Sequence, residues 1–158
     1  MKTYHFKFET TLPIALAEAW DFFSSPLNLT KITPEKMNFV IMSDFKADTK
    51  MYPGMFIRYK ITPLFGIKMN WVTEITHVKD QEYFVDEQRT GPYAIWHHEH
   101  HFKPVKGGVH MTDILTYAIP YGIIGRLANR LLVKKQVKMI FAYRDREIKK
   151  LFGIYKAV

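Results

Sequence analysis

The longest hydrophobic pattern with a helical period covers residues 121–152. Upstream of Val133 the apolar positions share a different face, so we expect a bend or break near residues 129–132. Arg144 falls near the middle of the apolar stripe and needs an acidic partner, a polar cavity or a route to water. The members of the stripe recur at gaps of three or four, and they are Val133, Val137, Ile140, Phe141, Ile148, Leu151 and Phe152.

Polar and apolar residues alternate over residues 4–10, which is the period of a strand with one buried face. Two short helices are expected to follow this strand. Pro13 suits the first turn of the first helix, and Ser25 suits the N-cap of the second, with Pro26 after it. The second helix is expected to end before Pro34, because a residue that precedes proline disfavours the helical conformation.

Six further runs have the composition and alternation of strands. They cover residues 38–42, 55–62, 68–78, 82–90, 94–103 and 109–119. Short separators of turn composition join the last four runs, so neighbouring strands should form antiparallel hairpins. Strands in one block with helices grouped at the ends predict an α+β fold, in which one curved antiparallel sheet of about seven strands wraps around a long C-terminal helix. The length predicts one domain, residues 1–158.

Composition narrows the classes of function. The sequence has no cysteine, which excludes disulfides and thiolate metal sites and fits a reducing compartment. Its first residues alternate instead of forming the apolar segment of a signal peptide, and no apolar run approaches the length of about 18 residues that a membrane span needs. We therefore expect a cytoplasmic protein.

The positive charge of the chain is uneven. From Gly122 to the end there are 10 Lys and Arg against 2 acidic residues, so the whole net charge of +8 lies in the last helix and tail. A solvated helix face is favoured over a site for an anionic surface, and weak contact with an anionic membrane stays an alternative. Binding to nucleic acid is not expected, because no recognised motif accompanies the charge.

The parity of three predicted strands indicates the candidate site. On each strand one face has apolar ends and a polar middle, which is unusual for a face in solvent, so we expect these faces to point inward. The three faces are Phe84, Asp86 and Gln88; Trp96, His98, His100 and Phe102; and Met111, Asp113, Leu115 and Tyr117. The polar members, joined by Arg144, are predicted to form a polar cluster inside an apolar cavity.

The histidines are candidates for two kinds of chemistry. His98 and His100 lie about 7 Å apart along one side of a strand, and spacing along the chain adds no third ligand, so no metal is expected. A His–Asp pair, either histidine with Asp86 or Asp113, is a candidate for acid–base catalysis. A satisfied buried network that orients a ligand is favoured over catalysis. Acyl transfer, nucleotide chemistry and thiol chemistry have no supporting motif.

The order of elements resembles the helix-grip fold of the START, Bet v 1 and polyketide-cyclase superfamily, often called SRPBCC. Local motifs look like those of the bacterial ligand-binding SRPBCC proteins: Pro26-Leu27-Asn28-Leu29, Ile32-Thr33-Pro34, Asp86-Glu87-Gln88, Gly91-Pro92, Trp96 with His98-Glu99-His100 and Phe102, Met111-Thr112-Asp113, and Phe141-Ala142-Tyr143-Arg144. The resemblance implies a deep cavity between sheet and last helix for an apolar or amphipathic small molecule. It does not imply a reaction, because the fold serves carriers, receptors and cyclases.

The expected function is therefore binding of a lipid-like or polycyclic molecule, without a cofactor, in a cavity of about 300 to 1,000 Å³. A cyclase or dehydratase that uses His98 or His100 is the alternative, and the oligomeric state is left open. The expected mouth consists of Phe65, Ile67, Tyr121, Ile123 and Ile124. The expected lining is Trp71, Phe84, Asp86, Gln88, Trp96, His98, His100, Phe102, Met111, Asp113, Leu115, Tyr117, Val137, Phe141 and Arg144.

Overall fold

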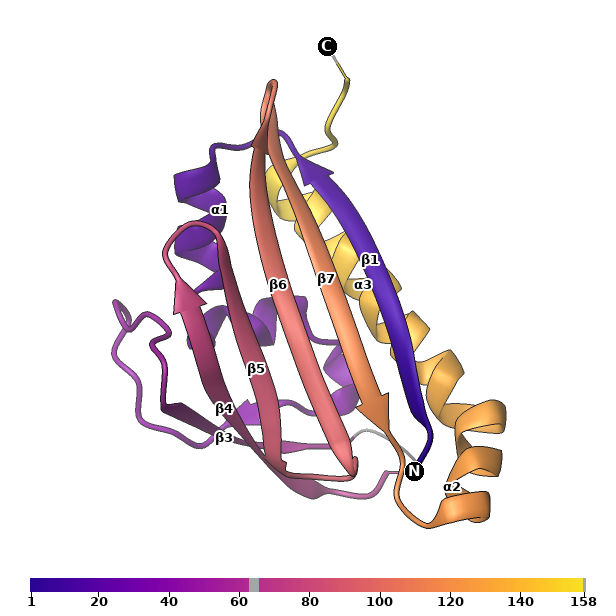
Figure 1. The fold of residues 1–158 in the computed structure, drawn as a ribbon. Helices are drawn as coiled ribbons and strands as arrows, with labels where there is room; N and C mark the ends of the chain where they lie inside the picture. The colour runs from indigo at the N-terminus through magenta and orange to yellow at the C-terminus, as the bar shows by residue number, and fades with distance from the viewer. Residues whose placement is uncertain (63–65, 158) are drawn as a thin grey trace.

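A computed structural model describes residues 1–62 and 66–157 of the chain (Figure 1). Seven antiparallel strands form one sheet in the order β1-β7-β6-β5-β4-β3-β2. The strands are β1 (Thr3–Leu12), β2 (Val40–Ile41), β3 (Met55–Ile61), β4 (Met69–Lys79), β5 (Tyr83–Thr90), β6 (Ile95–Val105) and β7 (Gly108–Ala118). The predicted number of strands and the hairpin pairing of β4 to β7 are confirmed. In addition, β3 pairs antiparallel with β4.

Three short helices follow β1 before the sheet continues. They are α1 (Leu16–Phe23) and two 3₁₀-helices, η1 (Pro26–Ile32) and η2 (Glu35–Met37). Ser25 occupies the N-cap of η1 as expected, although its side chain makes no capping hydrogen bond. The two helices predicted after the first strand are thus present, and η2 adds a turn that the sequence pattern did not indicate.

The C-terminal helix changes its winding where the apolar stripe changes face. It consists of α2 (Gly122–Ala128), a π-helical turn η3 (Asn129–Val133) and α3 (Lys134–Phe152). The predicted break near residues 129–132 is therefore confirmed as a π-turn, which is a recognised cause of kinks in helices. The buried side chain of Asn129 accepts a hydrogen bond from the hydroxyl of Tyr117 on β7 at 2.8 Å.

The last helix crosses one end of the sheet rather than its middle. In Figure 1, α3 runs behind β1 and β7, while α1 lies farther across the sheet, beside β6. Phe8 of β1 stacks on Phe141 of α3 with ring centroids 4.0 Å apart, and Leu115, Tyr117 and Val137 fill the seam beside them. A helix set over β1 and β7 leaves the concave face of β3 to β6 to be covered by other groups.

Two further groups of side chains cover the remaining concave face. Trp20 and Phe23 of α1 make edge-on and tilted contacts with Phe102, and Met37 packs with Trp71 near β3. These groups do not meet the seam under α3 everywhere, and the space between them is the cavity described below. Together the elements form the α+β helix-grip fold that the sequence predicts. Among the described residues, no helix is long and apolar enough to cross a membrane.

Candidate functional site

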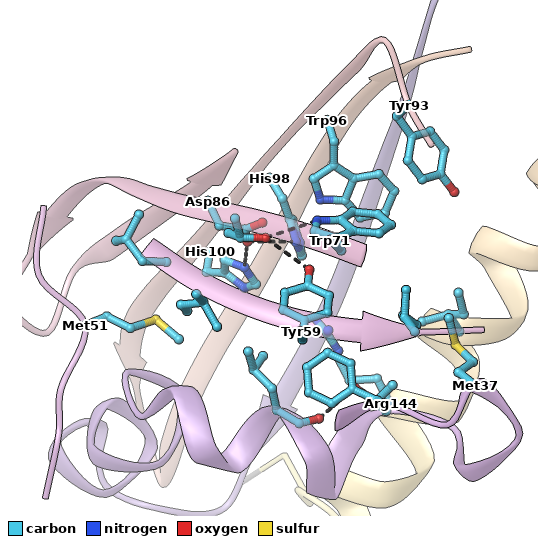
Figure 2. A pocket seen from close by; sticks show the side chains of 18 of the residues that line it. Met37, Met51, Tyr59, Trp71, Asp86, Tyr93, Trp96, His98, His100 and Arg144 are labelled. Atoms are coloured by element: carbon cyan, nitrogen blue, oxygen red, sulfur yellow. Dashed lines mark hydrogen bonds and ion pairs between the residues drawn. The ribbon is translucent and has the colours of Figure 1, made fainter. Parts of the chain in front are cut away.

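A cavity of about 110 Å³ lies between strands β3 to β6, the helices η1 and η2, and one side of α3 (Figure 2). This volume is below the range of about 300 to 1,000 Å³ expected for a drug-sized ligand. Most of the wall is apolar or aromatic, with polar groups on one side. The lining is Leu29, Thr33, Met37, Phe39, Met51, Ile57, Tyr59, Ile61, Trp71, Thr73, Ile75, Phe84, Asp86, Tyr93, Trp96, His98, His100, Gln136, Ile140 and Arg144.

Two histidines and two aspartates form a closed cluster beside this cavity. Strand register brings them together, because Asp86 of β5 pairs with His98 of β6, and His100 pairs with Asp113 of β7. The best-aligned hydrogen bonds run diagonally across the strands. His98 Nε2 lies 3.0 Å from Asp113 Oδ1, and His100 Nε2 lies 2.9 Å from Asp86 Oδ2. Diagonal neighbours on a sheet are within reach of long side chains, so the register alone accounts for the cluster.

Each imidazole also approaches the other carboxylate with its second nitrogen. His98 Nδ1 lies 3.4 Å from Asp86 Oδ2, and His100 Nδ1 lies 2.8 Å from Asp113 Oδ1. The two rings lie side by side, with centroids 3.8 Å apart. All four ring nitrogens therefore face carboxylate oxygens.

The electrostatics of the cluster favour its charged forms. Burial raises the pKa of both aspartates, but hydrogen bonds from His100 and His98 outweigh it and hold the pKa of Asp86 and of Asp113 well below its ordinary value. Burial opposes the charged form of His98, but its bonds to Asp113 and Asp86 raise its pKa. The two carboxylates are thus ionised and are weak bases.

Arg144 is the cationic residue of the cavity wall that the cluster does not neutralise. Its Nε is buried and has no hydrogen-bond partner, and its guanidinium carbon lies 5.2 Å from the ring centroid of Phe141. Arg144 and His100 also line a second cavity of about 30 Å³, which reaches Asp113 and Asp145. Arg144 was expected to need a polar cavity, an acidic partner or a route to water, because it lies in the apolar stripe of the helix. Its position in the walls of two cavities meets this expectation.

A second polar group in the wall is centred on Thr73. Its hydroxyl accepts a hydrogen bond from Trp71 Nε1 at 3.1 Å and lies 3.0 Å from the hydroxyl of Tyr59. Burial raises the pKa of Tyr59 and of Tyr93 well above the ordinary value, so both phenols stay neutral near pH 7. Their hydroxyls can donate or accept hydrogen bonds without bringing charge into the cavity.

The residues predicted for the site fall into three groups. The larger cavity is lined by Trp71, Phe84, Asp86, Trp96, His98, His100 and Arg144. The smaller cavity is lined by Met111, Asp113 and Phe141, together with His100 and Arg144. Neither cavity is lined by Gln88, Phe102, Leu115, Tyr117 or Val137.

Packing and hydrogen bonds explain why this third group lies elsewhere. The amide of Gln88 closes the turn between β5 and β6, because it donates to the carbonyl of Tyr93 at 2.7 Å and accepts from the backbone N–H of Tyr93 at 3.2 Å. Phe102 packs under α1, while Leu115 and Val137 belong to the seam under α3. Inward orientation was predicted for Phe102 and Leu115, but α1 and α3 cover the places where these two side chains point.

The predicted mouth also lies elsewhere. The described members Ile67, Tyr121, Ile123 and Ile124 are exposed and do not line the cavity, and Phe65 lies outside the described residues. Tyr121 and Ile123 border a separate surface depression beside the N-terminus. The expectation that these residues form the mouth is therefore wrong. The walls of the cavity come from β3, β4 and η2 among other elements, and no residue of α2 contributes to them.

Several lining residues were not predicted. Ile57, Tyr59 and Ile61 alternate along β3, and this pattern alone could have assigned them to the concave face. Tyr59 also pairs with Trp71, so the register continues the same face into β4. The residues from η1 and η2, such as Leu29 and Met37, carry no comparable signal because a short 3₁₀-helix has no sustained period.

Comparisons with known proteins support the fold. No family model matches the sequence, and no curated protein matches it. A crystal structure of a protein from Mycobacterium smegmatis is similar, with 14% identity, a TM-score of 0.64 and coverage of 96% of this chain and 98% of that one. A protein from Chromobacterium violaceum is 14% identical with a TM-score of 0.68, over 96% and 99% of the two chains.

The structure of Ara h 8.0201, a member of the Bet v 1 family, is 13% identical, with a TM-score of 0.59 and coverage of 94% of this chain and 99% of that one. The chain has the helix-grip fold. At these identities the likeness shows the fold alone, since one fold serves many functions. Evidence for the function therefore comes from the cavity and its side chains.

Proposed function

We propose that the protein binds a small amphipathic molecule that places an anionic or carbonyl acceptor beside Arg144 and an apolar ring against the aromatic wall. The observation that carries this proposal is the buried Nε of Arg144 without a hydrogen-bond partner at the edge of the cavity. An unpaired buried donor costs about 1–3 kcal/mol, and an acceptor on a ligand would recover that free energy.

The size of the cavity limits the ligand to about one ring. An apolar cavity of about 150 Å³ is known to hold benzene, and the cavity here has a volume of about 110 Å³. A lipid-like or polycyclic molecule would require the wall to move. The rings of Trp71 and Trp96 are in edge-on contact, with centroids 5.4 Å apart. They supply flat apolar surfaces for the ring of a ligand.

Binding is favoured over acid–base catalysis by the geometry of the histidines. Both nitrogens of His98 and both nitrogens of His100 face Asp86 or Asp113, so neither ring offers a free nitrogen to a molecule in the cavity. A general base must reach the proton that it removes. The resemblance to bacterial ligand-binding SRPBCC proteins supports the same preference, and the cyclase or dehydratase remains the less supported alternative.

Benzoate is a suitable probe because it joins one ring to one carboxylate. Its binding is measured from the fluorescence of the tryptophans in the wall and compared with binding of benzyl alcohol. A loss of about 2 kcal/mol of binding free energy on removal of the Arg144 guanidinium corresponds to about a 30-fold weaker affinity for benzoate. We expect Arg144→Met to weaken benzoate binding by about this factor and to change benzyl alcohol binding little.

The matched control is Arg146→Met, because Arg146 is on the same helix with its side chain 60% exposed. It should leave the affinity for benzoate unchanged. Native mass spectrometry of protein purified from its own host should show a bound small molecule with an acceptor group. Equal loss of benzoate affinity in the two variants would contradict the proposal, and so would the absence of both benzoate binding and a copurified molecule.

We also propose weak contact between α2 and an anionic membrane surface. Ile123, Ile124 and Leu127 are exposed on α2, and Arg126 and Arg130 are exposed near them. Apolar side chains flanked by cations suit the interface of anionic lipid. The protein should cosediment with vesicles that contain phosphatidylglycerol and less with pure phosphatidylcholine, and Ile123→Ser with Ile124→Ser should remove the difference. Equal sedimentation with both vesicles would refute this contact.

A further inference from the structure

The side of the His–Asp cluster nearest the cavity has the donor set of a metal site. Asp86 Oδ2 lies 2.9 Å from His100 Nε2 and 3.4 Å from His98 Nδ1. One ligand atom from each of the three residues lies within 4.8 Å of the other two, and Figure 2 shows the three side chains gathered at one side of the cavity. The third donor comes from a neighbouring strand, which is why spacing along the chain gave at most two.

The separations of these donors fit a first-row transition metal. Bonds of about 2.0–2.2 Å from Zn²⁺ to imidazole nitrogen and carboxylate oxygen place tetrahedral donors about 3.3 Å apart. The two N···O separations from Asp86 Oδ2 to the histidines, 2.9 and 3.4 Å, lie on either side of this value. These two separations would therefore change little on binding of an ion.

Asp113 stands where the partner of metal-bound histidines is usually found. A histidine that binds a metal through one nitrogen commonly donates its other N–H to a carboxylate, which fixes the ring and its tautomer. Asp113 Oδ1 lies 3.0 Å from His98 Nε2 and 2.8 Å from His100 Nδ1. With an ion on the Asp86 side, both remaining N–H groups would donate to this single carboxylate.

We propose that Asp86, His98 and His100 bind one divalent first-row transition-metal ion, with Asp113 as the positioning residue behind them. Two carboxylates balance the charge of one dication while the imidazoles stay neutral, which a buried site requires. Asp86, His98 and His100 line the larger cavity, whereas Asp113 lines the smaller one. The ion therefore faces the larger cavity, and three protein ligands leave at least one coordination position open there.

The opposite face of β6 provides a control with the same residue types. His97 Nδ1 lies 2.9 Å from Glu87 Oε1, and His101 Nε2 lies 2.9 Å from Glu99 Oε2. These side chains are about one third exposed, and Arg89 already pairs with Glu87 at 2.9 Å. Replacement of His97 should therefore leave binding at the inner site unchanged.

The first experiment is calorimetric titration of chelator-treated full-length protein with Zn²⁺ alone. We expect one ion per chain. His98→Gln and His100→Gln should each weaken binding at least 100-fold, Asp113→Asn should weaken it by about 10- to 100-fold, and His97→Gln should match the parent protein. Circular dichroism of every variant checks that the fold is intact. Absence of binding in the parent, or weakening by His97→Gln alone, would overturn the proposal.

A second experiment needs no substitution and so does not depend on the stability of any variant. Nuclear magnetic resonance of ¹⁵N-labelled imidazoles reports which ring nitrogen binds Zn²⁺. The structure assigns Nδ1 of His98 and Nε2 of His100 to the ion, with N–H retained at His98 Nε2 and His100 Nδ1. Coordination through the two other nitrogens, or signals that change at His97 and His101 instead, would refute the site. The result does not depend on whether benzoate or a related molecule binds.

Discussion

The π-turn in the C-terminal helix is expected to depend on one buried hydrogen bond. The hydroxyl of Tyr117 donates to Asn129 Oδ1 at 2.8 Å, and neither residue is more than 2% exposed. Tyr117→Phe removes the donor and leaves the amide oxygen of Asn129 buried without it. Because water cannot reach this oxygen, the substitution should lower the free energy of unfolding.

The magnitude follows from the cost of an unpaired buried acceptor, which is about 1–3 kcal/mol. A loss of about 2 kcal/mol corresponds to a decrease in Tm of about 4–8 °C for a domain of this length. Tyr155→Phe is the matched control, because the hydroxyl of Tyr155 donates to the carbonyl of Lys106 at 2.7 Å in an exposed position. Its effect should stay within about 0.5 kcal/mol.

Urea unfolding followed by circular dichroism measures these changes from the midpoint at constant m-value. A double-mutant cycle of Tyr117→Phe with Asn129→Leu isolates the interaction, since the double variant has neither the donor nor the stranded acceptor. We expect a coupling energy of at least about 1 kcal/mol. Additive effects of the two substitutions, or a loss in Tyr117→Phe no larger than in Tyr155→Phe, would refute the argument that burial makes this bond important.

Three further predictions concern stability. Without ligand, Arg144→Met should raise the free energy of unfolding by about 1 kcal/mol, because the buried Nε has no hydrogen-bond partner to lose. A lower Tm of this variant in thermal denaturation would count against this prediction. Gly125→Ala should destabilise by about 1–3 kcal/mol despite the better helix propensity of alanine, since its Cβ would overlap the carbonyl oxygen of Pro120; a raised Tm would exclude that overlap. Burial raises the pKa of Tyr117 to about 12. The contribution of this phenol to the free energy of unfolding should therefore be complete below about pH 10 and should fall between pH 10 and 12. A constant urea midpoint over this range would disprove the prediction.

The sequence predicts local elements well here because each has a clear period. Alternation over β1 and the turn-like separators of β4 to β7 mark the strands, and the change of apolar face near Asn129 marks the π-turn. The α+β architecture follows from the order of these elements. The 3₁₀-helix η2 was missed because its three residues are too few for any period.

The location of the cavity could not be derived from strand parity. Parity shows that Tyr117 and His98 point to the same side of the sheet, but not which one a helix covers. That choice depends on where α3 crosses, which is set by contacts distant in sequence, such as the stack of Phe8 on Phe141. Strand parity did predict that Asp86 and His98 belong to one polar cluster, but the register that places them directly opposite each other belongs to two strands at once.

The pairing of β1 with β7 has a consequence for how the chain is assembled. Thr3 lies opposite Ala118 and Leu12 opposite Val109, so within this sheet the strand that is synthesised first must wait for the strand that is synthesised last. Until then Tyr4, Phe6 and Phe8 have no sheet to join. Pairing of strands so distant in sequence slows folding, and unpaired aromatic strands invite association between chains during that interval. Completion of β7 is thus the step at which the nascent protein escapes this risk.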